Sequence, residues 1–111
     1  LGVAADTGGR TGREPAPVTS GSYEAGQALF VAKGCVTCHR HAEVSYSGFQ
    51  AAVGPDLTRA GRPGSPVPPG PDYLRAWLKD PPAIRPGTQM PNLGLTDQEV
   101  DDLLTFLLNS P

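Results

Sequence analysis

The stretch GCVTCHR, residues 34–40, decides the fold of this 111-residue chain. It holds both cysteines of the chain, Cys35 and Cys38, and one of its two histidines, His39. Two thiols and an imidazole this close together can hold a zinc ion, cycle as a redox dithiol, or attach a cofactor covalently. The remainder of the sequence discriminates among these three kinds of site.

Covalent haem attachment fits the motif better than the two alternatives. A structural zinc site needs four ligands, and the only other histidine is His41, two residues further on. A thioredoxin-like dithiol follows a strand, and no strand is predicted before Cys35. The pattern C-x-x-C-H is typical of haem attachment, in which both thiols form thioethers and the histidine binds iron. We therefore predict one covalently bound haem c on Cys35, Cys38 and His39.

The sixth ligand of the iron is predicted to be Met90, the only methionine of the chain. It lies in the loop RPGTQMPNLG, residues 85–94, where a methionine has few neighbours for core filling. A methionine paired with a histidine is one of the ligand sets that hold haem iron in electron carriers. His41 is the rival ligand, but it follows His39 so closely that its backbone lies on the wrong haem face. We expect His41 to be a solvated surface residue.

Helical spacing of apolar residues predicts an all-α chain without strands. The first helix is expected near 23–33, with Ser22 as N-cap and Gly34 as its stop signal. A second is expected from 71 or 72 to 79, where a pair of prolines ends it. Residues 40–70 are predicted to be mostly loop, because prolines and glycines interrupt any longer period.

The last predicted helix has the clearest signal. Thr96 and Glu99 form the capping-box pattern T-x-x-E, and apolar residues then recur at helical spacing as far as Leu108. Four acidic residues, Asp97 among them, lie near its N-terminal end and complement the helix dipole. This negative run therefore requires no external partner.

Composition and charge limit the organisation of the chain. Residues 1–21 lack apolar periodicity and are predicted to be a flexible tether or linker before a single domain, residues 22–111. The formal net charge of −2 gives no polybasic footprint, so no nucleic-acid partner is expected. No apolar run reaches the ~18 residues of a membrane span. Membrane association is expected only through a missing anchor or a parent subunit.

Basic residues outnumber acidic ones in the middle of the chain. Between Lys33 and Arg85 there are seven basic and four acidic residues. Such a surface can steer a partner of opposite charge. The candidates for this role are Lys33, Arg40, Lys79 and Arg85.

From about Tyr23 to Asn109 the chain resembles the class I c-type cytochromes. Four sequence blocks carry the resemblance: GQALFVAKGCVTCH (26–39), GPDL (54–57), YLRAWLKDPPAIRPGTQM (73–90) and DLLTFL (102–107). The resemblance implies three to five helices wrapped around one haem with His/Met ligation. It also implies that Phe106 of the last helix crosses Gly26 of the first, where a glycine permits close contact.

The resemblance also implies roles for residues around the haem. The Pro55 carbonyl is expected to accept a hydrogen bond from Nδ1–H of His39 and so to orient the ligand. Leu57 is expected to pack against a haem face, and Trp77 to line the methionine side.

Two further residues match the family less closely, and one segment departs from it. Arg62 lies near the family's propionate arginine, and Thr88 matches the threonine of its ligand loop, so both are predicted to belong to the haem site. The stretch between His39 and Pro55 is longer than in compact family members.

Two filled axial positions leave one-electron Fe(III)/Fe(II) cycling, so we predict an electron-transfer domain and not an enzyme. The blocks also resemble the haem c domain of subunit II of some bacterial haem–copper oxidases. This implies a quinol-oxidising complex as donor and the copper centre of a terminal oxidase as acceptor. The alternatives are a free or anchored periplasmic carrier for another oxidoreductase, and a haem sensor or peroxidase in which Met90 is labile. Haem c is attached outside the cytoplasmic membrane in bacteria, so a periplasmic or outer-face location is expected.

Overall fold

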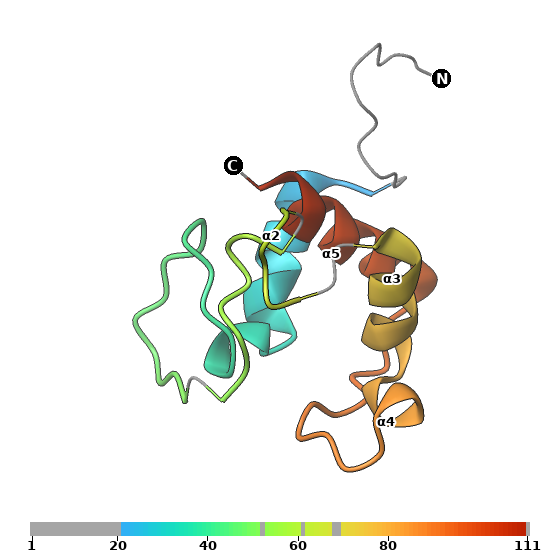
Figure 1. Ribbon diagram of the computed structural model, residues 1–111. Helices are drawn as coiled ribbons and strands as arrows, with labels where there is room; N and C mark the ends of the chain where they lie inside the picture. Colours follow the sequence, from blue (N-terminus) through green and yellow to red (C-terminus); the bar gives the residue numbers. More distant parts are fainter. Residues whose placement is uncertain (1–20, 52, 61, 68–69, 111) are drawn as a thin grey trace, which may run out of the picture.

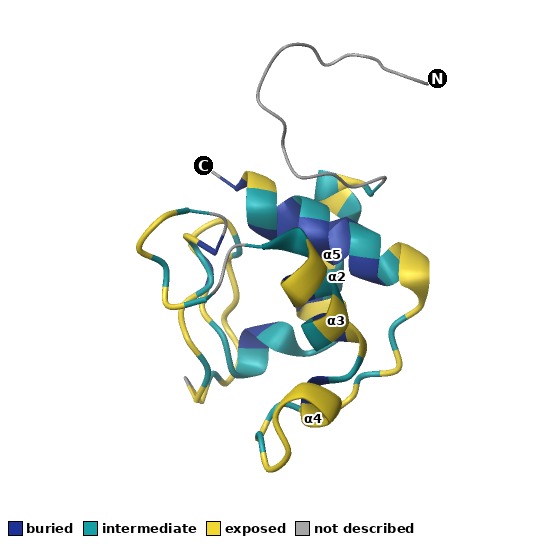
Figure 2. Ribbon diagram, turned by 45° about the vertical axis from the view of Figure 1, so that its right-hand side comes forward, coloured by how far each residue is buried: buried dark blue, intermediate teal, exposed yellow. Residues whose placement is uncertain are grey.

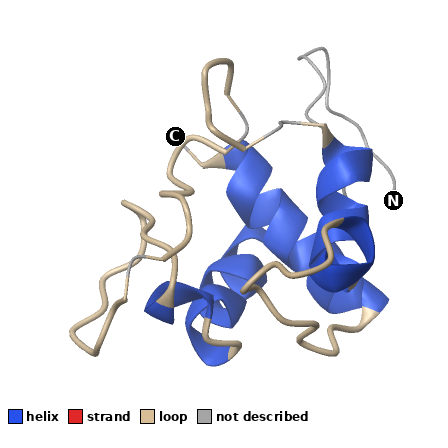
Figure 3. Ribbon diagram, turned by 60° about the horizontal axis from the view of Figure 1, so that its bottom comes forward, coloured by secondary structure: helices blue, strands red, loops and turns tan. Residues whose placement is uncertain are grey.

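The computed structural model describes residues 21–51, 53–60, 62–67 and 70–110, which contain four α-helices, one 3-10 turn and no strand (Figures 1 and 3). This confirms the predicted all-α class. Apart from Gly21, the predicted tether lies outside the described residues. The elements are α2 (Tyr23–Ala32), η1 (Cys35–Thr37), α3 (Pro71–Lys79), α4 (Pro81–Ile84) and α5 (Asp97–Asn109).

Side-chain caps set the N-terminal ends of α2 and α5, as predicted. The Ser22 hydroxyl accepts a hydrogen bond from the backbone N–H of Ala25 at 3.1 Å. At α5, Thr96 Oγ1 accepts from the backbone N–H of Glu99 at 3.1 Å, and Glu99 Oε1 accepts from that of Thr96 at 2.9 Å. These two bonds complete the capping box. Gly34 follows α2 with a φ of 83°, a conformation that glycine adopts without strain.

The short helix α4 differs from the sequence-based prediction. Pro81 and Pro82 were expected only to end a helix, and α3 does end before them at Lys79. A new turn of helix then begins at Pro81 itself. Proline is tolerated in a first helical turn because the N–H groups there have no partner within the helix.

The close crossing of α2 and α5 is the centre of the fold (Figure 1). A Cβ atom built on Gly26 would lie 2.0 Å from the backbone oxygen of Asp102 and 2.7 Å from Cβ of Phe106. Only glycine permits this approach, so the predicted contact between Gly26 and Phe106 is confirmed. Buried residues are concentrated along α5, as Figure 2 shows.

Asp102 makes a contact across this crossing that the sequence did not predict. Its carboxylate is buried and accepts hydrogen bonds from the backbone N–H of Ser22 at 2.8 Å and from Gln98 Nε2 at 3.0 Å. The side chain therefore joins the start of α2 to α5.

Two apolar clusters include residues of α5. The first consists of Phe30, Val36, Ala60, Phe106 and Leu107, and the second of Leu74, Leu78, Val100, Leu103 and Leu104. Cys35 packs at the edge of the first cluster, and Met90 packs at the edge of the second. The predicted attachment turn and the predicted methionine ligand therefore pack against different clusters. Figure 1 shows a similar division, with residues 40–51 and 53–60 on one side of the α2–α5 pair and α3 and α4 on the other.

Candidate functional site

The two cysteines lie on one tight turn. In η1, the backbone N–H groups of Cys38 and His39 both donate to the carbonyl of Cys35, at 3.1 and 2.9 Å. Thr37 Oγ1 donates to the carbonyl of Gly34 at 2.7 Å and holds the start of the turn. The two thiols are half-buried and not joined to each other. A turn of this kind presents two thiols and an imidazole as one rigid group.

The environment of these cysteines disfavours the zinc and dithiol alternatives. Burial raises the pKa of the Cys35 thiol to about 11, so this group is protonated at neutral pH. Redox-active dithiols react as thiolates, so a protonated Cys35 disfavours the dithiol alternative. Within the described parts of the chain, no cluster of three His, Cys, Asp or Glu side chains is placed to hold a metal ion.

His39 is fixed in one orientation by the following loop. Its Nδ1 lies 2.8 Å from the carbonyl oxygen of Pro55, which accepts only when Nδ1 carries the proton. This tautomer leaves the lone pair of Nε2 available for iron. The predicted contact between His39 and Pro55 is therefore present.

Gly54 is a site residue that sequence analysis missed. A Cβ at this position would lie 2.3 Å from Cε1 of His39, and the Gly54 N–H donates to the carbonyl of Cys38 at 2.8 Å. The loop backbone therefore lies directly against the imidazole ring. The signal in the sequence was the first letter of the GPDL block, which was assigned no role.

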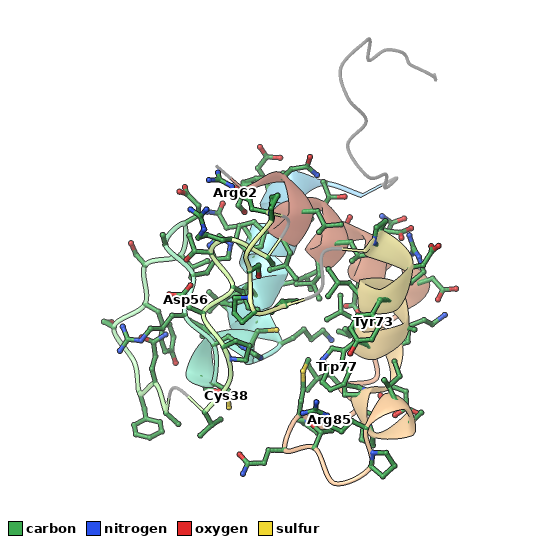
Figure 4. The ribbon with its side chains drawn as sticks, viewed as in Figure 1. Cys38, Asp56, Arg62, Tyr73, Trp77 and Arg85 are labelled. Atoms are coloured by element: carbon green, nitrogen blue, oxygen red, sulfur yellow. The ribbon has the colours of Figure 1, made fainter. Side chains whose placement is uncertain are left out.

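The Met90 side chain is held by a hydrogen bond to its sulfur. Trp77 Nε1–H donates to Sδ of Met90 at 3.1 Å, and the Met90 N–H donates to Thr88 Oγ1 at 3.3 Å. Leu74 and Leu78 are buried and fix the face of α3 from which Trp77 projects (Figure 4). Trp77 was expected to line this side, but not to act as a donor. A thioether sulfur has two lone pairs, so one remains for a metal.

Leu57 and Arg62 lie in different surroundings. Leu57 is half-buried against the first apolar cluster. Arg62 Nη2 donates to the backbone oxygen of Ser110 at 3.4 Å, close to the end of α5. In Figure 4 it lies at the opposite end of the molecule from Cys38. A role for Arg62 at a haem propionate stays a prediction, and this contact gives the residue a structural use.

The prediction that His41 is a solvated surface residue is wrong. Its side chain is only 5% exposed, and its ring centroid lies 4.4 Å from that of Phe106 and 5.8 Å from that of Phe30. Nδ1 accepts a hydrogen bond from the backbone N–H of Glu43 at 3.0 Å, whereas Nε2 has no partner. Burial lowers the pKa of His41 and so favours the neutral ring. The His41 ring therefore packs in the core against Phe30 of α2 and Phe106 of α5.

Two of the four cations that were expected to steer a partner form ion pairs with carboxylates of α5. Lys33 Nζ lies 3.4 Å from Glu99 Oε2, and Lys79 Nζ lies 2.5 Å from Asp97 Oδ1. Arg75 pairs with Asp101 in the same region. Arg40 and Arg85 are exposed and make no ion pair within the described residues. Three positive side chains of the central segment are therefore neutralised by carboxylates of the same domain.

The arrangement fits a covalently attached haem. Cys35 and Cys38 supply two thiols on one turn, His39 supplies an oriented imidazole with a free Nε2, and Met90 supplies a thioether from a separate segment. A histidine and a thioether together are a ligand set that haem iron accepts.

Comparison with known proteins gives matches of three kinds, to a family model, to a curated protein and to a solved structure. The family model described as cytochrome c matches residues 23–111. Cytochrome c oxidase subunit 2 of Bacillus sp. (strain PS3) is 28% identical over 97 residues, which cover 83% of this chain but 27% of that protein. The chain thus spans about a quarter of the length of that relative. The structure of cytochrome cH from Methylobacterium extorquens superposes with a TM-score of 0.56 at 26% identity, covering 78% of this chain and 97% of that one.

Proposed function

This chain belongs to the cytochrome c family of electron-transfer proteins with covalently bound haem c, and we propose that Cys35, Cys38, His39 and Met90 hold its haem. The cysteines would form the two thioethers of a bound haem, and the histidine and methionine would be the ligands of its iron. Bound haem supplies a one-electron Fe(III)/Fe(II) couple.

The contact between His39 and Pro55 carries this proposal. Donation from Nδ1–H to the Pro55 carbonyl at 2.8 Å fixes the ring, leaves Nε2 free to bind iron and would make the imidazole a better ligand. Gly54 keeps the loop against the ring, because any side chain at this position would strike the imidazole. His39 would thereby keep one orientation when haem is bound, and a fixed ligand would keep the reorganisation that accompanies electron transfer small.

Two hydrogen bonds support Met90 as a fixed ligand and not a labile one. Thr88 holds its backbone, and Trp77 holds its sulfur. A methionine that must leave to admit a peroxide or a diatomic gas gains nothing from such bonds. They therefore favour an electron carrier over the sensor or peroxidase alternative.

The ligand assignment is tested with Met90→Ala. The variant is expected to keep covalent haem, because the thioethers are untouched, and to lose the weak far-red band of methionine-to-iron charge transfer in the oxidised protein. Gln89→Ala is the matched control, since Gln89 is the exposed neighbour in the same loop. A band that survives in Met90→Ala refutes the assignment.

We further propose that the domain passes electrons to a terminal oxidase as part of a subunit II, with a quinol-oxidising complex as the original donor. The similarity to an oxidase subunit 2 supports this role. A free or anchored carrier is the second candidate, supported by the coverage of 97% of the cytochrome cH chain. The sequence encoded upstream of Leu1 separates the two. A copper-binding domain there supports the oxidase subunit, and a signal peptide alone supports the carrier.

The proposed location is the periplasm or the outer face of the cytoplasmic membrane. The cytochrome c family match supports it, because haem c is attached on that side in bacteria. Among the described residues, no helix has the length and apolar character of a membrane span.

A further inference from the structure

The long segment between His39 and Pro55 is hydrogen-bonded to the turn that carries the two cysteines. The Ala51 N–H donates to the carbonyl of Thr37 at 2.7 Å, and Gln50 Nε2 donates to the carbonyl of Val36 at 2.9 Å. With the bond from Gly54 to Cys38 described above, three contacts fasten this segment beside the haem-attaching cysteines. The haem site itself requires only Gly54 among these donors.

Within this segment, Tyr46 folds back over the chain. A Cβ at Gly48 would lie 2.4 Å from Oη of Tyr46 and 2.5 Å from Cζ. The ring therefore packs directly on the backbone of Gly48, next to Phe49. The segment thus has a defined local structure at its apolar end.

The segment carries three exposed large apolar side chains. Phe49 is 78% exposed, Val53 is 58% exposed and Tyr46 is 38% exposed. These three, called here the Phe49 patch, are half of the six exposed large apolar side chains among the described residues. Exposed apolar side chains gathered in one place usually mark an interaction site.

The charges around the Phe49 patch balance. Between residues 34 and 60 there are two basic residues, Arg40 and Arg59, and two acidic residues, Glu43 and Asp56. The more distant Lys33 and Lys79 are neutralised by carboxylates of α5. A partner of strong opposite charge therefore finds no complementary field here, whereas an apolar surface without net charge matches the patch.

We propose that the Phe49 patch is the docking surface for a redox protein whose own contact surface is apolar and carries no net charge. The inference rests on the proposed function, because docking here places the partner next to Cys38 and hence next to the haem edge. One electron leaves the reduced protein and enters the oxidised one, and no bond is made or broken.

Electron self-exchange between reduced and oxidised copies of the haem-loaded chain provides the test, since a second copy presents an apolar surface of the required kind. The rate constant is measured from NMR line broadening in mixtures of the two oxidation states. Phe49→Ser is expected to lower it at least ten-fold, because one buried aromatic side chain changes an association constant by about a power of ten. The ratio of wild-type to variant rates is expected to be the same at low and high salt.

Ile84→Ser is the matched control, since Ile84 is an exposed apolar residue on α4, outside the segment (Figure 1). Its self-exchange rate should equal that of the wild type. Equal rates for Phe49→Ser and wild type overturn the proposal, and so does an equal loss in both variants. Reduction of ferricyanide, which needs no protein docking, separates this inference from the proposed function. A chain that cannot reduce ferricyanide fails as an electron carrier, whereas one that reduces it normally but shows no effect of Phe49→Ser fails only at the docking surface.

Discussion

Replacement of Gly26 by alanine tests whether the α2–α5 crossing determines the stability of this domain. In a helix interior, alanine is favoured over glycine by about 1 kcal/mol, so helix propensity alone predicts a stabilised variant. The new Cβ would, however, lie 2.0 Å from the Asp102 carbonyl oxygen and 2.7 Å from Cβ of Phe106. Neither atom can turn away, because one is backbone and the other is bonded directly to it.

The two helices must therefore move apart by roughly 1 Å to restore ordinary contact distances. Overpacking of this kind typically costs 1–3 kcal/mol and occasionally more. Because relief requires movement of both backbones, we expect the upper end of this range and a net loss of about 2 kcal/mol after the propensity gain. For a domain of this size such a loss lowers Tm by roughly 8–16 °C.

The assay is urea unfolding of the haem-loaded protein, followed by the fluorescence of Trp77, the only tryptophan. Ala28→Gly is the control, since Ala28 is exposed on the same helix and its replacement reports propensity alone, about 1 kcal/mol of destabilisation. A Gly26→Ala variant as stable as the wild type, or more stable, refutes the claim that close backbone contact requires this glycine.

Three other changes test individual contacts. Trp77→Phe removes the hydrogen bond to Sδ of Met90 and should make the thioether a stronger donor to Fe(III). The reduction potential should then fall by roughly 40 mV for a bond worth ~1 kcal/mol. An unchanged potential in a spectroelectrochemical titration contradicts this. Asp102→Ala leaves a backbone N–H at the start of α2 without its acceptor and should cost about 1–3 kcal/mol in urea unfolding, with an undiminished midpoint as the contrary result. The backbone hydrogen bond from Thr96 lowers the pKa of Glu99 below its ordinary 4.5, so the folded state binds fewer protons than the unfolded state. This contribution is complete above that ordinary pKa and is lost as the pH falls through the lower folded value. Glu99→Gln should therefore flatten the acid limb of the stability curve, and an acid limb as steep as that of the wild type contradicts the reasoning.

Features that depend on neighbouring residues could be predicted from the sequence. The attachment motif is contiguous, so Cys35, Cys38 and His39 fall on one turn whatever the rest of the chain does. The caps at Ser22 and Thr96 are likewise local, because each side chain reaches a backbone N–H three residues on. The helix that begins at Pro81 was not predicted, because a proline is equally compatible with the end of one helix and with the first turn of another.

Features that depend on distant segments were decided only by the tertiary structure. Nothing near His41 in the sequence shows that the ring packs against Phe106, which lies on another helix. The pairing of Lys33 and Lys79 with carboxylates of α5 likewise required the packing of separate helices, and it neutralises two of the four cations that were expected to form a charged docking surface. The amino-acid sequence alone identified haem c as the cofactor and predicts the residues that attach it, because attachment chemistry needs only adjacent residues. The tertiary structure decided the orientation of the His39 and Met90 side chains and the character of the surface, because both depend on groups brought together from separate segments.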